Sequence, residues 1–386
     1  MTVTAPRGFR ASGIAAGLKS SGGLDLALVV NDGPRHDAAA VFTRNKVKAA
    51  PVLWSEQVLA TGRLRAVVLN SGGANACTGP EGFRTTHATA ERAAEVLGCG
   101  AIEVAVCSTG LIGAQLPREA VLAGVVAAST RLAADADAGL AAATAVMTTD
   151  TVAKQASHAD PAGWTIGGFT KGAGMIAPSM ATMLSVLTTD AVIDAAALRE
   201  ALRAAVRVSF DRLDIDGSMS TNDAVIAMAS GASGVEVDPM DLTTALTAVC
   251  RDLAQRMQAD AEGITKRVTV RVSGAAGEDD AVTVARTVAR DSLVKTALFG
   301  SDPNWGRVAA AVGYSAADVD PDLLDVTING VLLCRGGVAW GDRAAADLSG
   351  KEILVAIELG LGHGTAEILT TDLSRAYVEE NSAYSS

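Results

Sequence analysis

Residues 171–190 read K-G-A-G-M-I-A-P-S-M-A-T-M-L-S-V-L-T-T-D. The first part of this stretch is rich in glycine, which lets the backbone turn sharply or approach another group closely. The apolar residues within 183–187 predict a buried strand that ends at the polar Thr188-Thr189-Asp190. A small residue followed by a threonine (Ala181-Thr182) therefore lies between a glycine-rich loop and a buried strand. This arrangement suits a chain that cleaves itself.

The chemistry of such a cleavage needs only the residues at the junction. The Thr182 hydroxyl would attack the carbonyl carbon of Ala181, and hydrolysis of the resulting ester would free an N-terminal threonine. The new amine then serves as a nearby base for the hydroxyl, a recognised way to activate such a nucleophile. The alternative is a core strand preceded by a flexible loop, and this segment by itself favours that alternative.

Length and composition predict a globular chain of two or three domains. The chain has 386 residues, of which 49% are hydrophobic and 19% are charged, and its formal net charge is −11. This balance gives no overall attraction to nucleic acid or anionic lipid. The five cysteines form no C-x-x-C pair, and there is no signal peptide or apolar run of about 18 residues. We therefore expect a cytoplasmic protein that binds small molecules.

The hydrophobic pattern alternates between short apolar runs and longer helical repeats, which predicts an α/β fold. We expect the later residues 365–370 to pair as a strand with 353–359, and the polar tail 379–386 to be disordered. Asp137 is the expected N-cap of the helix over 138–147. The expected strands are 26–30, 39–43, 64–70, 102–107, 164–170, 183–187 and 268–272, and the expected helices are 87–97, 117–132, 138–147, 195–208, 241–261 and 279–299.

Two further positions suggest chemistry without proving it. Residues 108–113, S-T-G-L-I-G, follow a predicted strand in a turn that exposes backbone N–H groups, and such groups can stabilise an oxyanion. Ordinary turn chemistry explains the same residues. Glu262 stands at the end of a predicted helix, where a negative charge is mildly unfavourable. That cost hints at a role, although a solvated glutamate is also tolerated there.

Several common chemistries lack their motifs. The four histidines (His36, His87, His158 and His363) show no metal-ligand spacing. The sequence has no G-x-S-x-G elbow, phosphate-binding loop or dinucleotide fingerprint, and residues 214–223 do not fit a calcium loop. We expect neither a metal nor a cofactor. A hydroxyl nucleophile without a histidine base remains, and Thr182 is the best candidate.

Taken together, the motifs make the sequence similar to the ornithine acetyltransferase (glutamate N-acetyltransferase) family of arginine biosynthesis. The similarity covers nearly the whole chain, and the motifs are specific jointly and in this order. They are F-T-R-N (42–45), L-N-S-G-G-A-N-A-C-T-G (69–79), S-T-G-L-I-G (108–113), K-G-A-G-M-I-A-P (171–178), A-T-M-L (181–184), D-I-D-G-S (214–218), S-D-P-N-W-G-R (301–307) and E-N-S-A-Y (380–384).

The resemblance implies a fold of stacked sheet and helix layers with a smaller C-terminal α/β domain. It implies cleavage between Ala181 and Thr182 into an α chain (1–181) and a β chain (182–386), which assemble into a heterotetramer or larger. Thr182 would take acetyl from N2-acetyl-L-ornithine and pass it to L-glutamate, and acetyl-CoA is a further candidate donor. Thr109 and Gly110 match the family's oxyanion hole. The substrate-contacting positions match Thr148, Lys171, Thr182, Glu262, Asn381 and Ser386, the last varying between Ser and Thr in the family.

These roles agree with the charges of the side chains. Lys171 and Glu262 carry opposite charges, which suit the α-carboxylate and the amine of an amino-acid substrate. Lys171 would also lower the proton affinity of Thr182. Two alternatives remain. One is a self-processing amidohydrolase or aminopeptidase of related fold, in which water replaces glutamate. The other is an uncleaved structural or binding protein.

Overall fold

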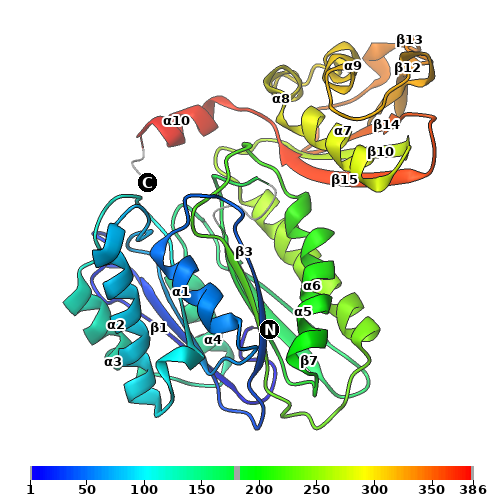
Figure 1. Cartoon of the computed structure of the whole chain (residues 1–386). Coiled ribbons are helices and arrows are strands. Elements are labelled where there is room, and N and C mark those ends of the chain that lie inside the picture. Colours follow the sequence, from blue (N-terminus) through cyan, green and yellow to red (C-terminus); the bar gives the residue numbers. More distant parts are fainter. Residues whose placement is uncertain (1, 178–182, 384–386) are drawn as a thin grey trace. The chain divides into compact units, whose positions relative to one another are not determined.

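The computed structural model describes residues 2–177 and 183–383, which form two compact units (Figure 1). The larger unit comprises the described residues up to 211 together with 218–257, and the smaller comprises 212–217 and the described residues from 258 onward. The predicted cleavage point between Ala181 and Thr182 lies outside the described residues. The predicted division into chains 1–181 and 182–386 therefore stays a prediction.

The larger unit contains a four-stranded sheet in the order β1-β2-β4-β5, in which only β4 and β5 are parallel. Helices α1 to α4 all contact this sheet, α1 and α2 at β5 and α3 and α4 at β1 and β2 (Figure 1). The strands are β1 (Phe9–Ile14), β2 (Leu26–Asn31), β4 (Ala66–Asn70) and β5 (Val104–Ser108). The helices are α1 (Ala50–Leu59), α2 (Gly79–Leu97), α3 (Arg118–Ser129) and α4 (Ala136–Ala145).

A five-stranded sheet in the order β3-β9-β8-β7-β6 completes the larger unit. Its middle strand β8 is buried along its whole length, which confirms the strand predicted after Thr182. Helix α5 contacts β3 and β9, and α6 runs beside α5 (Figure 1). The elements are β3 (Asp37–Phe42), β6 (Lys154–Ala159), β7 (Thr165–Lys171), β8 (Leu184–Thr189), β9 (Ala224–Ala229), α5 (Ala195–Arg207) and α6 (Pro239–Ala259).

The two sheets of the larger unit share one hydrophobic core. Strands β2 and β4 are apolar at nearly every position and completely buried, as expected for strands covered on both faces. Phe169, Val186 and Ile226 of the five-stranded sheet join the same cluster as Leu28 and Val67 of the four-stranded sheet. Burial of this apolar surface is the main stabilising term for the unit. It holds the loops at the strand ends in place.

The smaller unit has its own core and a six-stranded sheet in the order β13-β12-β11-β14-β10-β15. The buried face of α7 packs against β10 and β15. The elements are β10 (Arg267–Ala275), β11 (Asp325–Ile328), β12 (Val331–Arg335), β13 (Val338–Ala339), β14 (Glu352–Glu358), β15 (Gly364–Thr371), α7 (Glu278–Arg290), α8 (Ser292–Phe299), α9 (Trp305–Gly313) and α10 (Arg375–Ala383). The predicted α/β class and smaller C-terminal α/β unit are confirmed.

Four local predictions were wrong. Strand β15 pairs with β10 and not with β14, because β10 and β11 already occupy the two edges of β14. The helix expected over 279–299 is broken at Asp291, whose carboxylate accepts from Val294 N at 2.7 Å and starts a second helix. Helix α4 is capped by Asp135, not by Asp137. Residues 379–383 of the expected disordered tail belong to α10 (Arg375–Ala383).

Candidate active site

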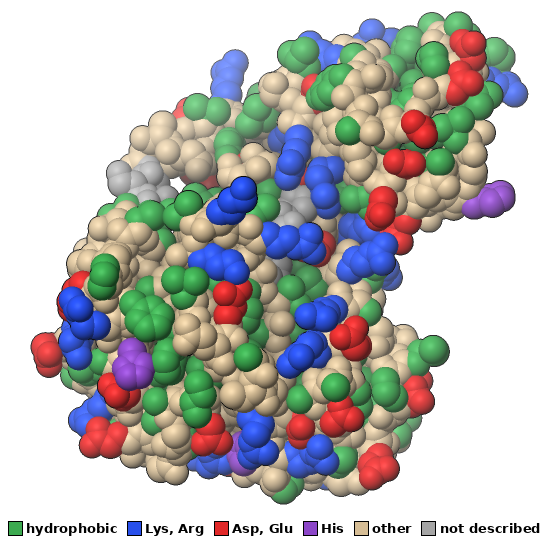
Figure 2. Space-filling model, viewed as in Figure 1, with side chains coloured by type: hydrophobic (Ala, Val, Ile, Leu, Met, Phe, Trp, Pro, Cys, Tyr) green, Lys and Arg blue, Asp and Glu red, His purple; other side chains and the backbone are tan. Residues whose placement is uncertain are grey.

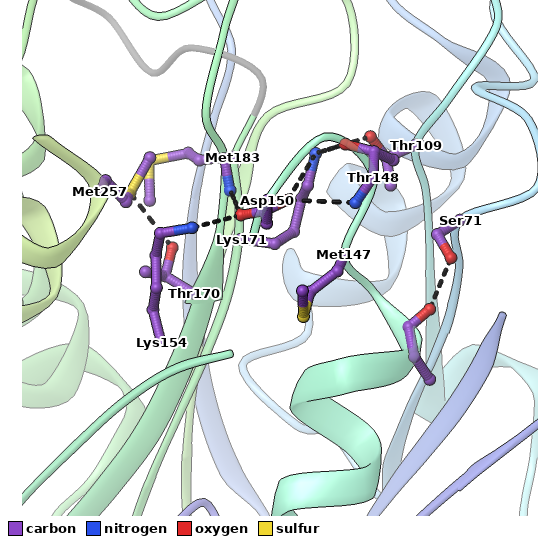
Figure 3. Close-up of polar contacts among 12 residues, drawn as sticks. Ser71, Thr109, Met147, Thr148, Asp150, Lys154, Thr170, Lys171, Met183 and Met257 are labelled. Carbon is purple, nitrogen blue, oxygen red and sulfur yellow. Dashed lines mark hydrogen bonds and ion pairs between the residues drawn. The ribbon is translucent and has the colours of Figure 1, made fainter. Parts of the chain in front are cut away.

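Three of the predicted site residues meet in the larger unit, at the ends of different elements (Figure 3). Thr109 follows β5, Thr148 follows α4, and Lys171 is the last residue of β7. The Lys171 ammonium donates to Thr148 Oγ1 at 2.7 Å and to Thr109 Oγ1 at 3.3 Å. The Lys171 side chain is only 1% exposed. The fold thus holds a buried ammonium between two hydroxyls from distant parts of the sequence.

The turn after β5 offers two hydrogen-bond donors of different kinds. The backbone N–H of Thr109 donates to Asn70 O at 2.9 Å, so this group is already used. Because Lys171 donates to the Thr109 hydroxyl, the hydrogen of that hydroxyl can point to another acceptor. The N–H of Gly110 has no acceptor among the described residues. The predicted turn is therefore present, but its donors are the Thr109 hydroxyl and the Gly110 N–H.

Only glycine fits at position 110. Its φ is +124°, a region that side chains rarely adopt, and a Cβ there would lie 2.9 Å from Gly73 N. The close approach follows from the pairing of Gly73 with Thr109, in which Gly73 N donates to Thr109 O at 3.0 Å. The small-residue loop after β4 therefore forms the support of the turn, a tertiary role that its sequence did not reveal.

Asp150 is a central residue of the site that the sequence reasoning missed. Its Oδ1 accepts from Lys154 Nζ at 2.6 Å and from Gly172 N at 2.7 Å. Its Oδ2 accepts from Thr148 N at 3.1 Å and lies 3.9 Å from Lys171 Nζ. Figure 3 shows this carboxylate between the two lysines. One signal was available, since Asp150 and Lys154 are four residues apart and the T-T-D triplet follows a helix.

The charge of Asp150 depends on these neighbours. Burial alone would raise the pKa of its carboxyl, but the ammonium groups of Lys171 and Lys154 outweigh burial and lower the pKa to about 2. The carboxylate is therefore ionised at neutral pH. The carboxylate accepts from the backbone N–H of Thr148 and lies beside the Lys171 ammonium, so it orients both Thr148 and Lys171.

Two more predicted residues meet in the smaller unit. Glu262 follows α6, and Asn381 belongs to α10. Asn381 Nδ2 donates to Glu262 Oε2 at 3.0 Å and to Tyr377 O at 3.0 Å. The Glu262 loop is held close to α10, because Ser374 Oγ donates to Gly263 O. Burial, with the charges of Asp216 and Glu262, raises the pKa of Tyr377 above its ordinary value. Helix α10 thus places an amide donor on the Glu262 carboxylate.

The remaining predicted positions cannot be compared with the structure. Thr182, Ala181 and Ser386 lie outside the described residues. The catalytic and substrate-binding roles of the site residues stay predictions.

Other classes of site find little support in the described parts of the chain. There, no group of three or more His, Cys, Asp or Glu side chains is placed to hold a metal ion. No helix within the described ranges is long and apolar enough to cross a membrane. On the face of the larger unit shown in Figure 2, acidic and basic side chains both occur, and several basic ones are grouped toward the top of the view.

Comparison with known proteins decides the family. The model of the ArgJ family matches residues 10–386, almost the whole chain. The chain belongs to the ArgJ family. It is 61% identical to "Arginine biosynthesis bifunctional protein ArgJ" of Mycobacterium tuberculosis, over 100% of this chain and 96% of that protein. It is 57% identical to the protein of the same name from Streptomyces coelicolor, over 100% of both.

Two solved ArgJ-related structures are also similar. Ornithine acetyltransferase from Mycobacterium tuberculosis, complexed with ornithine, is 62% identical and covers 47% of this chain and 96% of its own, with a TM-score of 0.46. ArgJ from Bacillus halodurans is 36% identical and covers 51% and 97%, with a TM-score of 0.49. The predicted family is confirmed by the sequence matches, and with it the predicted class, an acetyltransferase of arginine biosynthesis.

Proposed function

We propose that this ArgJ-family protein cleaves itself between Ala181 and Thr182 and then transfers acetyl from N2-acetyl-L-ornithine to L-glutamate through an ester on Thr182. The observation that carries the proposal is the cluster of Lys171, Thr109 and Thr148, beside a Gly110 N–H that has no acceptor among the described residues. This cluster supplies oriented donors and a buried cation without a metal ligand set. Acyl transfer through a hydroxyl needs such groups.

The reaction proceeds in two half-reactions. The free amine of Thr182 takes the proton of its own hydroxyl, and Oγ attacks the acetyl carbonyl carbon of acetylornithine. The Thr109 hydroxyl and the Gly110 N–H donate to the oxyanion. The C–N bond then breaks, the ornithine nitrogen takes the proton from the Thr182 amine, and an acetyl ester remains on Thr182. In the second half-reaction the amine of glutamate attacks the ester carbonyl carbon and gives a proton to the Thr182 amine. The C–Oγ bond then breaks, and this proton passes to Oγ, which restores the threonine hydroxyl.

Charged and polar groups supply the substrate contacts in this proposal. Lys171 and Thr148 would bind the α-carboxylate, which is a good acceptor for an ammonium and a hydroxyl. Glu262 would bind the substrate amine, and the contact of Asn381 with its carboxylate supports an oriented acceptor. Ser386 completes the set. Because the ester must wait for glutamate, water has to be excluded from the site.

The wider assignments belong to the same proposal. The α and β chains would remain together as a heterotetramer or larger assembly, in the cytoplasm. Acetyl-CoA is proposed as a second donor to glutamate. No metal or cofactor takes part in the proposed steps.

Mass spectrometry of the protein mixed with acetylornithine tests the proposal directly. We expect two fragments, with one acetyl group on the fragment that begins at Thr182 and its loss when glutamate is added. The control is Thr182→Ala, for which we expect a single chain of 39.0 kDa without acetyl. Steady release of ornithine, beyond one equivalent per site and independent of glutamate, would show an amidohydrolase instead.

A further inference from the structure

Asn222 and Asp223 lie directly before β9 and contact two parts of the proposed active site. One part is the start of β8, and the other is the turn that carries Thr109 and Gly110, called here the oxyanion turn. Strand β9 runs parallel to β8, with Ala224 opposite Leu184. One step back along both strands, Asp223 therefore stands beside Met183, the residue directly after Thr182. Met183 N donates to Asp223 Oδ1 at 3.0 Å, and Ala224 N donates to Met183 O at 3.2 Å. Both the N–H and the carbonyl of Met183 are therefore held by residues 223 and 224, at the start of β8, the nucleophile strand.

Asn222 makes the corresponding contact to the oxyanion turn. Its Nδ2 donates to Ser108 O at 2.8 Å and to Ala74 O at 2.6 Å. Ser108 O is the carbonyl of the peptide bond that leads into Thr109, whose N–H donates to Asn70 O. The peptide unit before the oxyanion donors is thus fixed at its oxygen by Asn222 and at its nitrogen by Asn70. Both hydrogens of the Asn222 amide are used, so a side chain without an NH₂ group cannot replace it.

The environment of both side chains is closed to solvent. Asp223 is 0% exposed and Asn222 is 4% exposed. Asp223 Oδ2 is buried without a hydrogen-bond partner among the described residues, which is costly for a carboxylate but much less so for a carboxylic acid. Burial raises the pKa of Asp223 well above its ordinary value, although the Met183 N–H opposes the change. The contact with the Met183 N–H needs only an acceptor oxygen, which the carboxyl group of Asp223 supplies in either protonation state.

We propose that Asn222 and Asp223 are positioning residues that set the nucleophile strand against the oxyanion turn, and that both self-cleavage and acetyl transfer depend on them. Neither residue needs to touch substrate for this role. The donors in an oxyanion site act only within a narrow range of distance from the reacting atom, so a small displacement of either half lowers the rate. The proposal rests on the proposed function, because it assigns the turn and the strand to that chemistry.

Exchange between asparagine and aspartate, which have nearly the same shape, should lower the activity strongly at position 222 and only slightly at position 223. Asn222→Asp removes both donors and places an acid against two carbonyl oxygens, whereas Asp223→Asn keeps an acceptor for Met183 N. For Asn222→Asp we expect kcat per active site to fall by about 10–100-fold, from the loss of two buried hydrogen bonds. The KM for acetylornithine should stay within about threefold, since Lys171 and Thr148 keep their contacts. Asp223→Asn should stay within about threefold of the wild type in kcat, and Asp223→Ala should lose at least about tenfold.

The experiment compares these three variants of the full chain with a matched control. Asn45→Asp is the control. Asn45 Nδ2 donates to Met219 O at 3.0 Å, in the loop that precedes Asn222, and the other hydrogen bonds of Asn45 within the described residues go to Thr43 and Val47. The first-turnover release of ornithine counts the competent sites, so kcat per site is separated from loss of folded protein. The rate of appearance of the two fragments reports self-cleavage.

The outcomes separate this inference from the proposed function. If the wild type forms no acetyl-Thr182, the proposed function fails. If the wild type does form acetyl-Thr182, the inference is tested by the variants. It is overturned if Asn222→Asp or Asp223→Ala keeps both kcat per site and the rate of self-cleavage within about twofold of the wild type. An equal fall in Asn45→Asp overturns it as well, because any change in the loop would then suffice. Should Asn222→Asp not fold, the Asp223→Asn and Asp223→Ala pair decides, and equal losses in that pair count against the proposal.

Discussion

Replacing Asp150 by asparagine tests whether the buried carboxylate holds the site together. Asparagine has the same shape, but its single oxygen replaces two that accept from Lys154, Gly172 and Thr148. The NH₂ group of the asparagine would take the place of an oxygen that accepts a hydrogen bond, so a donor would face another donor. The change also removes the negative charge that lies 3.9 Å from Lys171 Nζ. Two buried ammonium groups then lose the carboxylate that they share.

The magnitude follows from the charge of this carboxyl. Burial opposes ionisation, yet Lys171 and Lys154 lower the pKa of Asp150 from 3.8 to about 2. A folded-state pKa this far below the ordinary value corresponds to a stabilisation on the order of 2–3 kcal/mol at neutral pH. Removing one member of a buried ion pair costs about 3–5 kcal/mol, because the partner is left buried and uncompensated. We therefore expect a loss of about 3–5 kcal/mol and a fall in Tm on the order of 10 °C.

Thermal and urea unfolding of Asp150→Asn in a Thr182→Ala background measures this loss, provided that the background keeps the chain intact. Asp252→Asn is the control, since the Asp252–Arg256 pair is exposed and worth only about 0.5 kcal/mol. The carboxylate contribution is fully present above pH 3.8 and disappears as the pH falls to about 2, so the two proteins should converge in acid. A loss within about 1 kcal/mol of the control at pH 7 would refute the reasoning.

Three further changes have defined outcomes. Gly110→Ala places a Cβ 2.9 Å from Gly73 N at a φ of +124° and should lower kcat by about 10²–10³-fold, measured as acetylglutamate formation; a fall below about threefold would contradict the assigned role. Lys171→Met removes the ammonium between Thr109 and Thr148 and should lower kcat/KM for acetylornithine by at least about 100-fold, and an unchanged kcat/KM would exclude Lys171 from the site. Burial lowers the pKa of Lys295 to about 8, so between pH 8 and 10.5 the unfolded state binds more protons than the folded state. The unfolding free energy of the wild type, relative to that of Lys295→Met, should therefore rise with pH over this range. A difference that does not change with pH would rule out the lowered pKa.

The sequence by itself predicted those features that depend on local patterns. The run of apolar residues after Thr182 predicted a buried strand, and β8 is buried throughout. The helical pattern predicted over 195–208 is α5, and its apolar residues Leu198, Leu202 and Val206 are buried. The family followed from motifs spread over the chain, and the family model matches residues 10–386. Periodicity and motif spacing depend only on the order of residues along the chain, so these predictions required no knowledge of tertiary contacts.

Only the tertiary structure decided which groups the site presents. Thr109 looked like a source of a backbone N–H, but Asn70, about forty residues earlier, accepts that hydrogen and leaves the hydroxyl as the donor. The T-T-D triplet that contains Asp150 did not by itself indicate a site, and the importance of Asp150 comes from its contact with Lys171 of β7. Likewise, β15 joined β10 because the edges of β14 were occupied. Buried polar groups must find partners wherever the fold brings them, and partners distant in sequence leave no local pattern.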